Sequence, residues 1–188
     1  MINAIFDVKG FAESTRKYTP TSIGDEADVK KDSRISMLEF DLAKSPVFGI
    51  FGDRWKNLFQ RWINIGAKIE LFIQDLNPER IKMLENLLKP KDSVLDVYDF
   101  SNIPVVGGIE TENFRNYHFT LFYNPKQLWT ESRHLPGKGK MSGCEYNKER
   151  FTGLGEKSYW EARFEKYDAL LKEIKIHEHC RKLPIGKR

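Results

Sequence analysis

The chain has 188 residues and a mass of 22.0 kDa, the length of one domain, and its 40% hydrophobic content excludes a wholly disordered chain. No run reaches the roughly 18 apolar residues of a membrane span, and the first ten residues lack the layout of a signal peptide. The net charge of +4 is compatible with a nucleic-acid partner without requiring one. Two cysteines, Cys144 and Cys180, are too few for a disulfide framework, so we expect a cytoplasmic protein.

The first 45 residues differ in pattern from the rest of the chain. Residues 2–8 are apolar and β-prone, which is typical of a short strand. Residues 10–44 are rich in Ser, Thr, Lys and Asp and have no sustained hydrophobic period. We therefore expect an irregular arm over 1–45, with one short helical turn around 36–42.

From residue 46 onward, strand-like and helix-like segments alternate. Short apolar runs predict three strands, at 47–51, 67–73 and 94–98. Apolar residues at three- and four-residue spacing predict helices between them, over 53–66 and 77–88. The strand–helix–strand–helix–strand order predicts right-handed crossovers and parallel strands.

The alternating segment 117–123 predicts a further strand after a Gly- and Pro-containing loop over 101–116. The turn at Asn124 and Pro125 then leads to an expected hairpin partner at 127–131.

The last third of the chain is expected to consist of a loop or lid, a helix and a tail. Residues 135–155 contain five glycines, 159–177 carry a core-facing apolar stripe, and 181–188 are basic. The fold class is therefore α/β, with a mixed, mainly parallel sheet flanked by helices. We expect this domain to occupy 46–176, between the arm and a basic C-terminal tail over 177–188.

His118 is the first candidate catalytic residue because it lies near the start of a predicted strand, after a long loop. Period two places it on one face with Thr120 and Phe122. A histidine at a sheet edge can act as a nucleophile or general base near neutral pH. The alternative is a core histidine that donates to a backbone carbonyl.

A second group of candidates follows the predicted hairpin. Glu131 is placed to orient a histidine across the sheet, and His134 is a further acid–base candidate. Arg133 offers a fork for phosphate, and Lys138 lies in a basic, Gly-rich segment able to close over an anion. The alternative is a solvated strand end followed by a flexible loop.

His177, His179 and Cys180 invite a metal interpretation, but on a continuing helix the two histidines diverge by about 200°. Neither Cys180 nor Cys144 belongs to a paired C-x-x-C motif, and histidines at a helix C-terminus are favoured by the helix dipole. The usual ATP and NAD fingerprints are missing as well. We expect no metal site and no cofactor.

From residue 46 to 175 the order of elements resembles the phospholipase D superfamily. The likeness rests on a helix ending in NIGAKI, the following strand ELFIQD, and the later strand beginning Tyr117-His118-Phe119, where the family carries an H-x-K-x-x-x-x-D motif. The resemblance implies that His118 accepts a phosphoryl group from a phosphodiester, in nucleic acid or a nucleotide. It also implies a homodimer, because single-motif members supply the second motif from a partner copy.

For this reaction Glu131 and His134 are the acid–base candidates. The phosphate contacts are expected from Thr120, Lys126, Arg133 and Lys138.

The motif is incomplete here, since Thr120 occupies its lysine position and Pro125 its aspartate position. Threonine can donate a hydrogen bond to phosphate but cannot neutralise its charge. Two alternatives follow. One is a non-catalytic binding or interaction module that kept the fold and lost the chemistry. The other is an enzyme with Cys144 as nucleophile beside a histidine.

Overall fold

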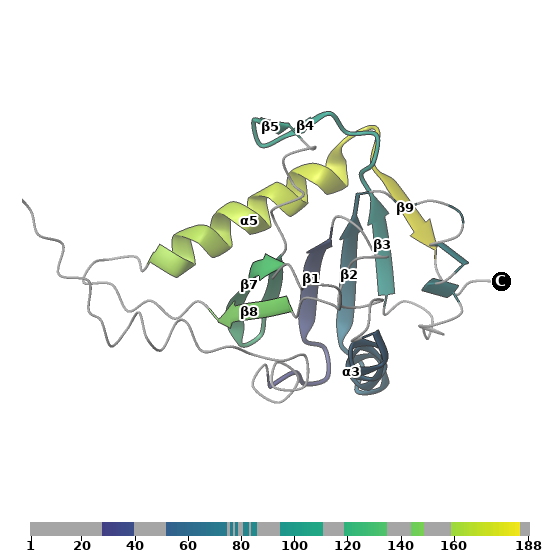
Figure 1. The fold of residues 1–188 in the computed structure, drawn as a ribbon, viewed down its shortest axis with the longest axis vertical. Coiled ribbons are helices and arrows are strands. Elements are labelled where there is room, and N and C mark those ends of the chain that lie inside the picture. The colour runs from purple at the N-terminus through teal and green to yellow at the C-terminus, as the bar shows by residue number, and fades with distance from the viewer. Residues whose placement is uncertain are drawn as a thin grey trace, which may run out of the picture.

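The computed structural model describes residues 28–39, 52–74, 95–110, 119–134, 144–148 and 159–184, with residues 76, 78, 81, 82, 84 and 85 (Figure 1). The elements in chain order are β1 (Arg34–Glu39), α3 (Gly52–Asn64), β2 (Lys68–Ile73), β3 (Leu95–Asp99), β4 (Val105–Val106), β5 (Ile109–Glu110), β6 (Phe119–Tyr123), β7 (Lys126–His134), β8 (Cys144–Lys148), α5 (Tyr159–Ile176) and β9 (Arg181–Pro184). Neither of these helices is long and apolar enough to cross a membrane.

The seven-stranded sheet has the order β8-β7-β6-β1-β2-β3-β9. Strands β1, β2 and β3 are parallel, and the other four pairings are antiparallel. The α/β class and the mixed sheet are confirmed, but the expectation of a mainly parallel sheet is wrong. The reason is that β8 and β9, where a loop and a tail were expected, each add an antiparallel pairing, and that the hairpin strand β6 also pairs antiparallel with β1.

The central strand β1 lies within the segment for which the sequence predicted an irregular arm and a helical turn. It pairs in parallel with β2 and antiparallel with β6. Ile35 and Met37 point to one side and Leu38 to the other, so both faces are buried. Ser36 donates to Glu70 Oε2 at 2.6 Å, which satisfies the buried hydroxyl. The strands predicted at 2–8 and 47–51 lie outside the described residues.

Helices α3 and α5 cover opposite faces of the sheet (Figure 1). The apolar stripe of α3 packs on one face through Leu58, Phe59, Trp62 and Ile63. The stripe of α5 packs on the other through Phe164, Tyr167, Leu170, Leu171 and Ile174. The helices predicted over 53–66 and 159–177 are confirmed, and the described residues of the third predicted helix, over 77–88, are helical as well. Gly66, at φ 88°, ends the α3 segment in the left-handed conformation that its position predicts.

Two further strands lie where the sequence predicted a loop and a C-terminal tail. Strand β8 lies inside the predicted loop 135–155 and pairs with β7, and β9 lies inside the predicted tail and pairs with β3. The basic residues of β9 pair with acidic residues of β3, with Lys182 Nζ 2.9 Å from Asp96 Oδ1. With β1 and β9 included, the sheet extends beyond the predicted range 46–176 at both ends.

The loop over 101–116 contains a small hairpin formed by β4 and β5, which is separate from the main sheet. Its turn consists of Gly107 and Gly108, both with positive φ, at 57° and 73°. The Gly107 N–H donates to Glu173 Oε1 at 2.8 Å, which ties the hairpin to α5.

Candidate functional site

One edge of the sheet collects the ends of several strands, and we call it the carboxyl edge. The parallel strands β1, β2 and β3 end there at Glu39, Ile73 and Asp99. Strand β6 runs the other way and begins there, because Phe119 pairs with Leu38 near the end of β1. Ligands of open α/β sheets bind outside the carboxyl ends of parallel strands, so this edge is the first place to look for a site.

Strand β7 returns to the same edge. Phe119 pairs with Thr130, so the last residues of β7 run past the start of β6. The backbones of Glu131, Arg133 and His134 therefore lie at the carboxyl edge, where β8 joins them through a register shift between Glu131 and Arg133. Their side chains are outside the described part of the structure. His118 and Lys138 are outside the described residues, and His118 directly precedes Phe119 in the chain.

The structure separates two of the predicted phosphate contacts, Thr120 and Lys126. Thr120 is only 3% exposed and is paired in register with Met37 and Trp129, on the face that α3 covers. Lys126 lies at the opposite edge and the opposite face, with Nζ 4.8 Å from the Phe164 ring centroid. These two side chains therefore do not meet at one phosphate.

Sequence reasoning missed a polar group at the end of β3. Asp99 is 1% exposed, and its Oδ1 accepts from both the N–H (3.0 Å) and the hydroxyl of Ser101. The Arg181 guanidinium of β9 donates to Asp99 Oδ2, while 58% of the Arg181 side chain is exposed. The signal that was available is an aspartate directly after an apolar strand, but its partner lies 82 residues away in an expected tail.

Gln74 follows β2 at the same edge and is 9% exposed. Its side-chain Oε1 is buried and has no hydrogen-bond partner in the part of the chain that the structure describes. Ser101 links the ends of β2 and β3 beside it, since its hydroxyl oxygen, whose hydrogen is directed to Asp99, accepts from the Leu76 N–H at 3.3 Å and lies 3.4 Å from the Gln74 carbonyl oxygen. Leaving a buried acceptor unsatisfied costs about 1–3 kcal/mol. An unpaired acceptor at this edge therefore marks a place where a ligand can supply a hydrogen-bond donor.

A second polar cluster lies between the sheet and α5. The Glu70 carboxylate accepts from Arg34 Nη2 at 2.9 Å, from Ser36 and from Lys175 Nζ. Burial by itself raises the pKa of Glu70, but the hydrogen bonds from Lys175, Ser36 and Arg34 outweigh it and hold the pKa below its usual value. Both cations are occupied by Glu70, so this cluster fastens α5 to the sheet.

The histidines after α5 lie close together, with ring centroids of His177 and His179 5.4 Å apart. The His179 N–H donates to His177 Nδ1 at 3.2 Å, which leaves that nitrogen acting as an acceptor. Burial, with a smaller contribution from Asp99, raises the pKa of the Cys180 thiol. Within the described ranges, no three His, Cys, Asp or Glu side chains are grouped to hold a metal ion. For Cys144 the structure describes the backbone, in β8, and not the side chain.

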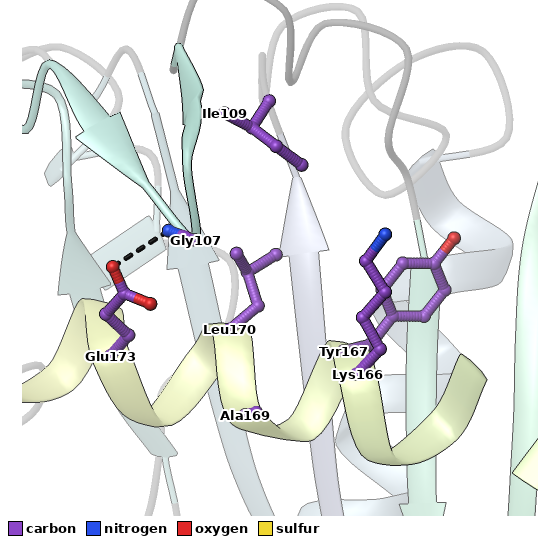
Figure 2. Close-up of a pocket in the computed structure, with 7 residues that line it drawn as sticks. All are labelled: Gly107, Ile109, Lys166, Tyr167, Ala169, Leu170 and Glu173. Carbon is purple, nitrogen blue, oxygen red and sulfur yellow. Dashed lines mark hydrogen bonds between the residues drawn. The ribbon is translucent and has the colours of Figure 1, made fainter. Parts of the chain in front are cut away.

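A hollow of about 200 Å³ lies between the small hairpin and α5. Figure 2 shows Leu170 rising into it from the helix, with Ile109 facing it from the hairpin and the Glu173–Gly107 hydrogen bond closing one side. The lining is mainly apolar and offers no activated nucleophile. It is a less suitable site for phosphate chemistry than the carboxyl edge.

No protein family model matches this sequence, and a search of curated proteins finds no match. The chain is similar in structure to the polyphosphate kinase of Porphyromonas gingivalis, with 11% sequence identity and a TM-score of 0.46. The likeness covers 89% of this chain but 22% of the kinase, so the chain spans about a fifth of that protein's length. The case for a function therefore comes from this chain's own residues.

Proposed function

We propose that this chain is a divergent phospholipase D-like domain that cleaves or binds a phosphodiester, in nucleic acid or a nucleotide, at the carboxyl edge. The observation that supports the proposal is the pairing of Phe119 with Thr130. This register brings the start of β6, which follows His118, to the same edge as the backbones of Glu131 and His134. In this proposal His118, which the resemblance marks, acts together with Glu131 and His134 from the neighbouring strand end.

In the catalytic form of the proposal, a ring nitrogen of His118 attacks phosphorus and the P–O bond to the leaving group breaks. His134 or Glu131 gives a proton to the departing alkoxide, and water then hydrolyses the phosphohistidine bond. Arg133 and Lys138 neutralise the phosphate oxygens. This chain would then be a phosphodiesterase or nuclease-like hydrolase.

The second candidate is a module that binds the same ligand without cleaving it. The burial of Thr120 favours this candidate, because the motif position that the family fills with lysine here holds a neutral side chain packed against the core. Without that cation the transition state loses several kcal/mol of electrostatic stabilisation unless Arg133 or Lys138 supplies it. Binding of a phosphodiester needs less positive charge than its cleavage, so binding tolerates the loss of the motif lysine more readily.

The decisive comparison uses wild type, His118→Ala and the matched control His179→Ala, whose histidine is half-exposed beyond α5. Hydrolysis is followed on bis(p-nitrophenyl) phosphate and on single-stranded DNA, and affinity by fluorescence anisotropy over a series of salt concentrations. The catalytic form predicts a hundredfold or greater loss of hydrolysis in His118→Ala alone.

The binding form predicts no hydrolysis by any of the three proteins, with salt-dependent affinity that weakens in His118→Ala. Absence of both hydrolysis and salt-dependent binding in wild type would contradict the proposed function. Thermal melts of each variant confirm that the fold is intact.

A homodimer is part of the proposal only in its catalytic form, because two copies of the motif are needed there. Sedimentation equilibrium at the protein concentration of the assay measures this directly. Hydrolysis by a strictly monomeric sample would contradict the requirement for a second copy.

A further inference from the structure

We infer that Arg181 of β9 binds a backbone phosphate of a nucleic-acid strand that lies along the carboxyl edge, so that the ligand is a polymer and not a mononucleotide. This inference rests on the proposed function and narrows its ligand. It concerns a residue that the sequence placed in a basic tail.

The first argument is the way Arg181 is held. Asp99 lies directly opposite it in register, is 1% exposed, and is itself fixed by two hydrogen bonds from Ser101. A buried carboxylate fixes the orientation of the guanidinium on one side, while more than half of the Arg181 side chain faces solvent. A planar fork fixed in this way suits the bidentate recognition of phosphate.

The second argument is position. Arg181 lies at the carboxyl edge, and its strand is four places from β6 in the order β6-β1-β2-β3-β9. At about 4.8 Å per strand, the two strands are roughly 19 Å apart. Phosphates follow one another at about 3.4 Å along the axis of a helical strand, so this span corresponds to about five or six nucleotides. A mononucleotide bound at the start of β6 is too short to reach Arg181.

The third argument is the unpartnered acceptor between them. Gln74 directly follows β2, which lies between β6 and β9 in the sheet, and its buried Oε1 has no partner in the described residues. The edges of nucleobases carry hydrogen-bond donors, such as the exocyclic amines of adenine and cytosine and the N3–H of thymine. A nucleic-acid strand therefore offers a phosphate to the solvent-facing side of Arg181, whose other side is paired with Asp99, and a donor to Gln74.

A purely structural role for Arg181, as the counter-ion of Asp99, makes a different prediction. In that case substitution lowers stability, and any loss of affinity is the same for short and long ligands. If Arg181 binds a phosphate, the loss of affinity grows with ligand length.

The experiment measures the affinity of the full chain for thymidine dinucleotide and for an oligothymidylate of about twelve nucleotides. The variants are Arg181→Gln, Arg181→Lys and His118→Ala, with Lys182→Gln as the matched control. Lys182 is the next residue, is about equally exposed, and is paired with Asp96 instead of Asp99. Arg181→Lys keeps a cation beside Asp99, so it provides a folded variant if Arg181→Gln loses stability.

We expect Arg181→Gln to weaken binding of the long strand about five- to tenfold and to lower its salt exponent by about 0.7, the value of one phosphate contact to a single strand. Binding of the dinucleotide should stay within twofold. Arg181→Lys should retain the salt exponent and lose about two- to threefold in affinity. Lys182→Gln should change neither affinity by more than twofold.

Equal affinity of wild type and Arg181→Gln for the long strand would overturn the inference, as would an equal loss for both ligands. If His118→Ala weakens both ligands while Arg181→Gln weakens neither, the proposed function stands and the role of Arg181 is wrong. If wild type binds neither ligand, the proposed function fails and the inference fails with it.

Discussion

The Tyr123 hydroxyl donates a hydrogen bond to Asp168 Oδ1 at 2.6 Å, which joins the end of β6 to the middle of α5. Burial and the Asp168 hydrogen bond both raise the pKa of Tyr123, so the phenol stays protonated and remains the donor. Burial opposes the ionisation of Asp168, but hydrogen bonds from Lys172 and Tyr123 hold its pKa below the usual value. The helix is thereby fixed over the strand that leads from the carboxyl edge.

Replacing Tyr123 by Phe should lower the free energy of unfolding by about 1–2 kcal/mol, since a hydrogen bond to a charged group is lost while Asp168 keeps its ion pair with Lys172. Tyr167→Phe is the control. Its hydroxyl accepts from Arg163 at 2.8 Å, and its loss should be smaller, about 0.5–1 kcal/mol, because the partly exposed guanidinium can be hydrated instead. Urea unfolding measures both. A Tyr123→Phe variant as stable as wild type would show that this hydrogen bond does not hold α5.

The Glu70 cluster predicts a pH dependence. Because the folded-state pKa of Glu70 is lowered, its contribution to stability is present above the unfolded value of about 4.5 and is lost as the pH falls through the folded pKa. Glu70→Gln should therefore be less stable than wild type at pH 7, by about 2–3 kcal/mol. The difference should shrink as the pH is lowered below about 4.5. Urea midpoints across this range test the sign, and a difference that widens in acid would contradict it.

Gly107 and Gly108 form a matched pair for testing the contact between hairpin and helix. Both have positive φ, so alanine is strained at either position. At Gly107 an added Cβ also meets Leu170 Cδ1 at 2.9 Å, whereas at Gly108 it meets nothing within 4 Å. We expect Gly108→Ala to lower the free energy of unfolding by about 1 kcal/mol and Gly107→Ala by about 2 kcal/mol. Equal losses in urea unfolding would show that the packing against Leu170 is loose.

Because β1 is the central strand of the sheet, truncating one of its buried side chains should lower stability strongly, which would not be expected of an irregular arm. Met37 is fully buried on the α3 side, so Met37→Ala should lower the free energy of unfolding by about 2–4 kcal/mol. Val105→Ala in the half-exposed position of β4 is the control and should change stability by less than about 1 kcal/mol. Chemical denaturation separates the two. A Met37→Ala loss as small as that of Val105→Ala would remove β1 from the core.

Much of the fold was predictable because its periodicity is strong. The helices α3 and α5, the strands β2 and β3 and the hairpin of β6 and β7 all follow from local patterns. Strand β1 was not predicted because it is short and lies in a polar segment, where Arg34 and Ser36 resemble solvent-exposed side chains until Glu70 of a neighbouring strand accepts their hydrogen bonds. Strand β9 was missed for the same reason, since Arg181 and Lys182 resemble a solvated tail until Asp99 and Asp96 are opposite them.

The candidate site was predictable only in part. A hairpin necessarily returns Glu131 to the start of β6, so the pairing of these strand ends follows from local sequence. Thr120 lies on the sheet face that α3 covers, and Lys126 lies at the other edge on the face that α5 covers. Which helix covers which face is decided by tertiary packing, which the motif does not encode. Asp99, Gln74 and Arg181 come together only through the order of strands in the sheet.

The most direct test of the account is to map where a single-stranded oligonucleotide binds, from backbone amide chemical shifts of the labelled protein. We predict perturbation at the carboxyl edge, at Leu38, Gln74, Phe100, Phe119 and Thr130. The opposite edge, represented by Ser33, Gly66 and Asn124, should be unchanged, although it carries the exposed cations Lys30 and Lys68. Perturbation confined to that opposite edge would contradict the proposed site, whatever the affinity.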